Sequence, residues 1–283
     1  LPTHFYQAID KPTQTISATD LHQLGLANFW GWLAYSIYDD VMDQETNPKL
    51  ITIANFAHRE FILNYAQTML GDSQFIQHLT QLMTQIDSAE LKEITDCRGV
   101  VKKHLLTLPA RLPDYTLLTQ IADKSIGHAL GPLAILYRLG YSRYDAPVQF
   151  LLEFMYHYLT ARQLNDDIHD WEDDLKNGHL SPVVTQLIKT YFATSLTQSQ
   201  LKINPTTIAQ FRKLFWYEVL PQTINDIQQQ LQLAKTAIEQ GSIITKPQFF
   251  INLLQKLDIT ATKTLNEQQQ AIEFIQTYEE NGR

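Results

Sequence analysis

The sequence predicts an all-α protein of about ten helices. Long stretches carry apolar residues at intervals of three and four positions, as from Leu21 to Ile37, which is the period of a helix with one buried face. Little of the chain alternates apolar and polar residues with the period of a strand. Residues that begin and end helices recur between the apolar stretches. We therefore expect helices packed around one core.

The first half of the chain gives six expected elements. They are a capping arm without clear period over 1–17, a helix from Asp20 to the acidic segment 39–43, a helix from Pro48 to Gly71, a helix from Asp72 toward Ile86, a helical piece over 90–98, and a short helix followed by a loop over 99–113.

The second half gives five more elements, all helical. They are a helix begun by Asp114 and kinked near Gly131-Pro132, a helix from Asp145 to Gly178, and three helices beginning near Pro182, Pro205 and Pro247.

Length and composition limit the classes of function. With 283 residues, 44% of them hydrophobic, the chain is expected to form a single domain over 1–283, although a first residue Leu1 also suits one part of a longer chain. The net charge of −8 argues against a nucleic-acid partner. Cys97 is the only cysteine, which favours a reducing, cytoplasmic location. No apolar run is long enough to predict a membrane span.

Two acidic clusters carry the chemistry. Asp39, Asp40 and Asp43 lie together at the end of an apolar helix, where the helix dipole already adds negative charge, so a cation is expected there. In the second cluster, Asp166, Asp170 and Asp174 follow one another at intervals of four residues, and Asp167 flanks them.

Carboxylate oxygens at this spacing suit Mg²⁺, which is usually held by a few carboxylates together with substrate phosphates. The two clusters therefore predict a diphosphate clamp. The candidate metal ligands are Asp39, Asp40, Asp43, Asp166, Asp167, Asp170 and Asp174, and the catalytic candidates among them are Asp39, Asp40, Asp43, Asp166 and Asp170. A single acidic cluster is usually a solvated helix end, but two of matching form, each after an aromatic-rich helix, favour the metal site.

These residues resemble the motifs of the class I isoprenoid synthases. Asp39-Asp40-Val41-Met42-Asp43 is similar to their first aspartate-rich motif, and the segment from Gln163 to Asp170 resembles the second motif of the trans-prenyltransferases. Lys124-Ser125 resembles the diphosphate-binding Lys-Thr of that family. The resemblance covers about Leu24 to Lys189.

The resemblance implies an isoprenoid-synthase bundle around a central cavity, with three Mg²⁺ ions and an allylic isoprenyl diphosphate as substrate. Lys124, helped by Arg162 or Lys176, would bind the diphosphate. The side chains expected to line the cavity are Phe29, Trp32, Tyr35 and Tyr158. A homodimer is also compatible with the resemblance.

The departures from the family favour one branch. Chain-elongating prenyltransferases commonly carry an Arg-Arg-Gly after the first motif and a Gly-Lys-x-x-Arg near the N-terminus, and this sequence has neither. A second diphosphate therefore has no evident cationic site. We expect a terpene synthase acting on one C15 or C20 diphosphate. An elongating prenyltransferase and a squalene- or phytoene-synthase-like condensing enzyme stay open, although the latter has Arg where this chain has His169.

Two further classes are also open. His169-Asp170 could belong to a metal phosphohydrolase of HD type, for which His128 and His157 are weak additional ligands. A non-enzymatic helical scaffold is the other alternative.

Overall fold

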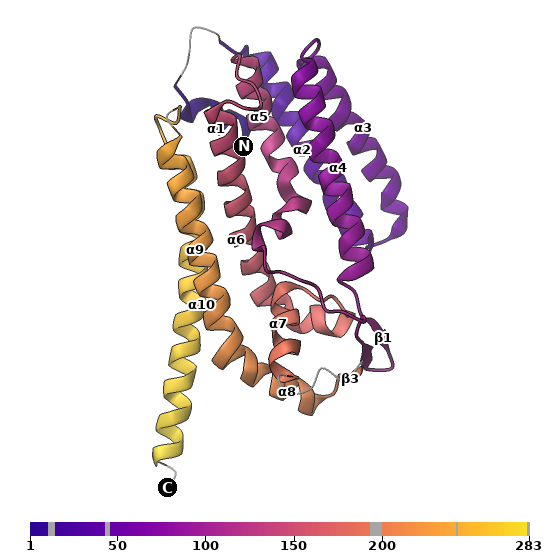
Figure 1. Ribbon diagram of the computed structural model, residues 1–283, viewed down its shortest axis with the longest axis vertical. Coiled ribbons are helices and arrows are strands. Elements are labelled where there is room, and N and C mark those ends of the chain that lie inside the picture. The colour runs from indigo at the N-terminus through magenta and orange to yellow at the C-terminus, as the bar shows by residue number, and fades with distance from the viewer. Residues whose placement is uncertain (11–14, 43–45, 193–199, 242, 282–283) are drawn as a thin grey trace. The chain divides into compact units, whose positions relative to one another are not determined.

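The computed structural model describes residues 1–10, 15–42, 46–192, 200–241 and 243–281, and it confirms the all-α prediction (Figure 1). Of the residues that the structure describes, 78% are helical. The α-helices of the described residues are α1 (Pro2–Ala8), α2 (Ala18–Met42), α3 (Ile51–Thr68), α4 (Ser73–Asp96), α5 (Leu130–Arg138), α6 (Ala146–Asn177), α7 (Pro182–Tyr191), α8 (Pro205–Leu214), α9 (Leu220–Gln240) and α10 (Gln248–Asn281).

Shorter elements connect these helices. They are the 3₁₀ turn η1 (Pro48–Leu50), the 3₁₀ helix η2 (Leu118–Ala129), the π-helical turn η3 (Phe215–Val219), and the strands β1 (Val100–Lys102), β2 (Leu105–Thr107) and β3 (Gln200–Lys202).

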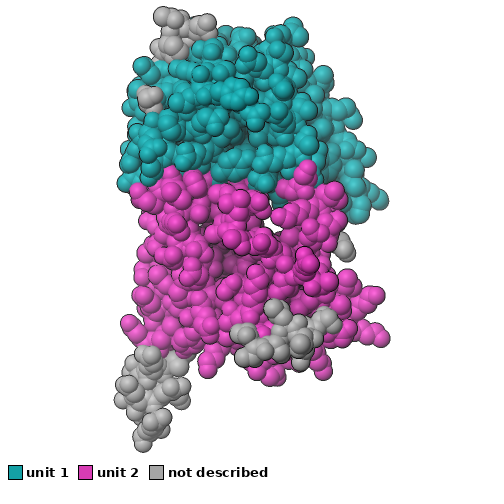
Figure 2. Space-filling view, in the orientation of Figure 1, with its two compact units in different colours: residues 1–87, 123–156, 234–252 teal, residues 88–122, 157–233, 253–283 magenta. Residues whose placement is uncertain are grey.

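Internal contacts divide the chain into two compact units (Figure 2). Unit 1 comprises residues 1–87, 123–156 and 234–252, and unit 2 comprises residues 88–122, 157–233 and 253–283. Helices α4, α6, α9 and α10 each contribute residues to both units. The single-domain organisation over 1–283 stays a prediction.

The core of unit 1 is built on α2 and α3, which run alongside each other (Figure 1). Gly31 makes their close approach possible, because a Cβ atom at that position would lie 2.8 Å from the Phe61 ring. Tyr65 is fully buried, and its hydroxyl lies 3.3 Å from Asn28 Oδ1, which also accepts a hydrogen bond from the backbone N–H of Gly131. Asn28 thereby links α2 to both α3 and α5.

In unit 2, the end of α6 is fixed against the strand region. Gly178 adopts φ +77°, and a Cβ atom there would lie 2.6 Å from the carbonyl oxygen of Gly99. Only glycine fits at this position, where a residue in the left-handed conformation ends the helix. Leu106 and Leu201 bury one face of the small antiparallel sheet, whose strand order is β1-β2-β3.

Three elements in the first half of the chain differ from the sequence-based expectations. The capping arm contains the helix α1, which buries Phe5. The two pieces expected over 72–86 and 90–98 form the single helix α4, since no residue between them breaks a helix. The short helix expected within 99–113 is wrong: β1 and β2 form a hairpin there, with Lys103 and His104 at φ +49° and +62° in the turn.

Candidate functional site

The first acidic cluster lies on the last turn of α2, in unit 1. Asp39 and Asp40 are at least partly exposed, and the third predicted ligand, Asp43, lies outside the described residues. The Nζ atom of Lys124 lies 2.9 Å from Asp39 Oδ1, and the two side chains are 23% and 46% exposed. The lysine thus supplies positive charge at the helix end, where the dipole and the carboxylates call for a cation.

Lys124 belongs to η2, where the sequence predicts a kinked α-helix. The structure has a 3₁₀ helix up to Ala129 and the α-helix α5 from Leu130. Runs of 3₁₀ helix longer than three or four residues are uncommon because their hydrogen bonds have poorer geometry. The lysine is therefore carried by a segment that depends on its neighbours for support.

A side-chain bridge next to Lys124 was not foreseen from the sequence. Gln85 of α4 donates from Nε2 to Asp123 Oδ1 and to the Tyr156 hydroxyl oxygen, both at 2.7 Å. Asp123 directly precedes the lysine, which was the only sequence signal for it. The sequence gives no signal for Gln85 or Tyr156, because partly buried residues of these types occur on many helices.

The predicted cavity residues of α2 have different environments. The hydroxyl of Tyr35 lies 4.0 Å from Met83 Sδ, and its ring contacts those of Tyr38 and His58. Phe29 and Trp32 are 47% and 51% exposed. Tyr35 is thus enclosed by neighbouring side chains, whereas about half of each of the other two faces outward.

The second acidic cluster lies on α6, within unit 2. Asp166 and Asp170 are exposed on one face of the helix. Arg162 Nε lies 3.9 Å from Asp166 Oδ2. Partial burial raises the pKa of Asp166, Arg162 lowers it, and the like charge of Asp170 raises it further, so that the pKa stands above its ordinary value. A bound cation would relieve this repulsion.

Asp167 points away from that face into the interior of unit 2. It is 3% exposed, and its Oδ1 accepts a 2.9 Å hydrogen bond from Gln163 Nε2. Its Oδ2 has no hydrogen-bond partner among the described residues. Burial raises the pKa of this carboxyl to about 7. Asp167 therefore lies in a different environment from Asp166, although the sequence predicts both as metal ligands.

Asp174 takes part in an ionic network at the end of α6. Its Oδ1 lies 3.1 Å from His179 Nδ1, and Glu93 Oε1 lies 3.8 Å from His179 Nε2 and 3.0 Å from Arg98. Burial alone lowers the pKa of His179, but Asp174 and Glu93 outweigh it and raise the pKa. The network joins α6 to the end of α4.

The remaining predicted residues of α6 have local partners. Lys176 Nζ lies 2.7 Å from Asp173 Oδ1, one turn before it. Tyr158 is half-buried, and burial raises its pKa, while Arg162 lowers it and Asp166 raises it. His169 Nδ1 lies 2.6 Å from the carbonyl oxygen of Asn165. This ring nitrogen therefore contacts the backbone of its own helix.

The donor sets on α2 and α6 suit magnesium chemically. Asp39 and Asp40, and separately Asp166 and Asp170, present hard carboxylate oxygens on accessible helix faces. Within the described part of the chain, no three or more His, Cys, Asp or Glu side chains form a group that could hold a metal ion.

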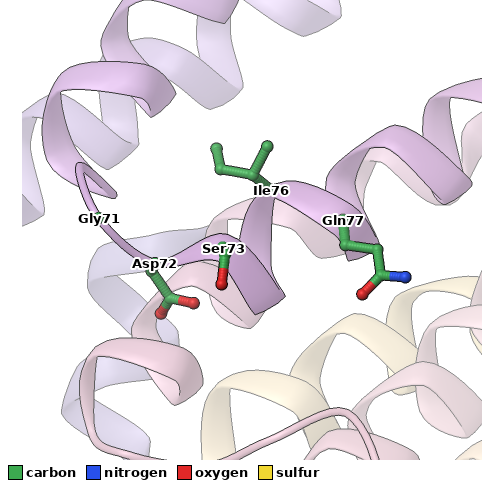
Figure 3. Close-up of a pocket in the computed structure, with 5 residues that line it drawn as sticks. All are labelled: Gly71, Asp72, Ser73, Ile76 and Gln77. Atoms are coloured by element: carbon green, nitrogen blue, oxygen red, sulfur yellow. The ribbon is translucent and has the colours of Figure 1, made fainter.

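A surface hollow of about 370 Å³ lies at the start of α4 (Figure 3). Its lining residues are Gly71, Asp72, Ser73, Ile76 and Gln77. Asp72 is used there as a helix cap, since its Oδ1 accepts from the backbone N–H of Phe75 at 2.9 Å. No predicted site residue lines this hollow.

Comparison with known proteins adds no family assignment. No protein-family model matches the chain, and no curated protein matches it significantly. Among the described helices, none combines the length and apolar character needed to cross a membrane.

Proposed function

We propose that this chain is a magnesium-dependent class I terpene synthase, which ionises a C15 or C20 allylic diphosphate and rearranges the resulting carbocation. The ion pair between Lys124 and Asp39 carries the proposal. These residues stand 85 positions apart. The resemblance to class I isoprenoid synthases implies diphosphate binding for Lys124 and magnesium binding for Asp39. Their contact at 2.9 Å supports a shared role.

The accessible carboxylates would hold the metal. Asp39 and Asp40 on α2, and Asp166 and Asp170 on α6, are the residues we assign to magnesium. When bound, magnesium would neutralise negative charge on the diphosphate leaving group.

The chain's own side chains account for the other requirements of the reaction. As the allylic C–O bond breaks, its electron pair stays on the diphosphate oxygen, and the Lys124 ammonium stabilises that developing charge. For this, Lys124 would exchange its contact with Asp39 for one with a phosphate oxygen when the substrate binds. The aromatic rings of Tyr35 and Tyr158 would each stabilise a carbocation that lies against them by roughly 0.5–2 kcal/mol. The carbocation closes on its own double bond and then either loses a proton to the released diphosphate, which gives a hydrocarbon, or adds a water molecule that gives up a proton to the diphosphate, which gives an alcohol.

The experiment is incubation with Mg²⁺ and geranyl, farnesyl or geranylgeranyl diphosphate, each with and without isopentenyl diphosphate. We expect a hydrocarbon or alcohol and inorganic diphosphate from a C15 or C20 substrate alone. A longer diphosphate would instead identify an elongating prenyltransferase, and a head-to-head product would identify a condensing enzyme. Failure of Mg²⁺ and inorganic diphosphate to raise the melting temperature would favour the scaffold alternative.

Lysine variants provide the matched control. Lys124→Met should lower diphosphate release by at least about 100-fold, because it removes a cation from the leaving group. Lys49→Met changes an exposed lysine of η1 in the same way and should leave the rate unchanged. Equal rates in the two variants would remove Lys124 from the mechanism.

A further inference from the structure

We propose that Gln85 is a positioning residue, which fixes the rotation of η2 about its axis so that Lys124 faces Asp39. The inference rests on the proposed function of Lys124 and adds a residue that no sequence motif indicates. Gln85 itself would touch neither substrate nor metal. It would act through the backbone that carries the lysine.

The geometry of the bridge is specific. An amide nitrogen carries two hydrogens, and Gln85 Nε2 directs them to two acceptors on different elements, Asp123 Oδ1 on η2 and the Tyr156 hydroxyl on α6. Both distances are 2.7 Å. The bridge thus ties η2 to α4 and α6, and all three residues lie in unit 1.

The position of Asp123 makes the bridge effective. In a 3₁₀ helix, three residues complete one turn, so neighbouring side chains point about 120° apart. Holding Asp123 against Gln85 therefore directs Lys124 to another side of η2. That side meets α2, where Lys124 Nζ lies 2.9 Å from Asp39 Oδ1.

η2 also needs such support more than an α-helix would. It runs for twelve residues with 3₁₀ geometry, although such helices seldom exceed three or four residues. Gln85, Asp123 and Tyr156 are each partly buried, which shields the bridge from competing water. A partly buried carboxylate also needs a hydrogen-bond donor, and the Gln85 amide donates such a bond to Asp123.

The main test compares Gln85→Leu with Gln77→Leu, the same change on an exposed residue two turns earlier on α4. Hydrogen–deuterium exchange of residues 118–129 is measured in the full chain. We expect exchange to accelerate about tenfold in Gln85→Leu and to stay at the wild-type rate in Gln77→Leu. Unchanged exchange in Gln85→Leu would overturn the proposal, and so would equal acceleration in both variants.

Steady-state release of diphosphate tests the link to Lys124. We expect Gln85→Leu to lower kcat about tenfold while KM changes less than about threefold, because the lysine acts mainly as charge develops. Asp123→Ala should behave in the same way. Asp123→Asn keeps an acceptor oxygen for the Gln85 amide and should recover most of the rate. A loss as large in Asp123→Asn as in Asp123→Ala would contradict the bridge.

A double variant separates positioning from general destabilisation. If Gln85 acts through Lys124, Gln85→Leu should lower kcat much less in a Lys124→Met background than in the wild type. A further tenfold fall in kcat in the Lys124→Met background would show that Gln85 does not act through Lys124. If the wild-type chain releases no diphosphate at all, the proposed function fails, while the exchange experiment still decides whether Gln85 holds η2.

Discussion

The two acidic helix segments look alike in the sequence but have different environments in the structure. At the end of α2, Asp39 pairs with Lys124, a cation brought from a distant element of unit 1. On α6, the cations beside Asp166 and Asp173 come from the same helix, three or four residues away. A contact between distant elements depends on the fold, whereas a pair within one helix follows from spacing alone.

The described acids of the second segment also differ from one another in exposure to solvent. On α6, Asp167 is buried and Asp174 is engaged with His179, so only part of the cluster is available to an external cation. Carboxylates grouped by a motif therefore divide into those that can bind a ligand and those that hold the helix in place. The predictions that follow test this division.

The largest expected effect concerns the exposed acids. Asp39→Ala should lower the proposed Mg²⁺-dependent diphosphate release by about 10²–10³-fold, because it would remove a proposed metal ligand and does remove the partner of Lys124. Asp173→Ala removes an acid that is 77% exposed and pairs only locally with Lys176, and it should leave the rate within about twofold. Similar rates in the two variants would show that the contact to Lys124 marks no site.

The next effect concerns the buried Asp167 and depends on pH. Its pKa is about 7 in the folded chain against 3.8 for the ordinary carboxyl. Between these values the folded state binds more protons than the unfolded state, so this residue lowers the free energy of unfolding as pH rises from about 4 to 7. Asp167→Asn should therefore be more stable than the wild type by up to about 4 kcal/mol near pH 8.

Urea denaturation across this pH range measures the effect. The advantage of Asp167→Asn should shrink steadily as the pH falls from about 7 to about 3, because below both pKa values the wild-type carboxyl is neutral in the folded and the unfolded state. Asp170→Asn, on the exposed face of the same helix, is the matched control and should show no comparable gain. If the difference in free energy of unfolding between Asp167→Asn and the wild type did not change with pH, the raised pKa of the buried carboxyl would be contradicted.

A smaller effect is expected from the network at the end of α6. Asp174→Asn weakens the interaction with His179 and should lower the free energy of unfolding by about 1–2 kcal/mol. The pKa of His179 is raised in the folded state. The stabilisation that the charged His179 contributes is therefore complete below the unfolded pKa of about 6.5, and it is lost as the pH rises through the folded pKa. The cost should therefore be larger at about pH 6 than at about pH 9. A cost without pH dependence would show that His179 is not the partner.

Much of the helical fold could be predicted because helix signals are local. Asn47 and Pro48 begin a helical turn, and Gly178 ends α6, as the sequence indicates. The hairpin of β1 and β2 could not be predicted, since its strands are three residues long and its turn places Lys103 and His104 at positive φ without glycine or asparagine.

For the candidate site, the sequence indicates residue types and helix faces but not the contacts between elements. Helical spacing places Asp166 and Asp170 on one face, and the apolar series Leu164, Ile168 and Trp171 marks the buried face toward which Asp167 turns. The bridge from Gln85 had no such signal, because it joins three elements whose packing is set by the tertiary fold.

The smallest expected effect concerns Lys176, for which the resemblance to isoprenoid synthases implies a role in diphosphate binding. Its pair with Asp173 joins side chains that are 49% and 77% exposed, and such pairs contribute about 0–1 kcal/mol. A lysine in the last turn also interacts favourably with the helix dipole. Lys176→Ala should therefore lower the free energy of unfolding by about 0.5 kcal/mol at low salt, and by less at about 1 M salt, where the charges are screened.

Diphosphate release by Lys176→Ala completes the comparison with Lys124. A single exposed cation that helps to bind diphosphate should raise KM about threefold when it is removed and leave kcat unchanged. Lys189→Ala alters an exposed lysine in the last turn of α7 and serves as the control. An unchanged KM would leave Lys176 as a partner of Asp173 alone. A fall in kcat as large as that of Lys124→Met would show that cations paired within one helix can act as strongly as one brought from a distant element.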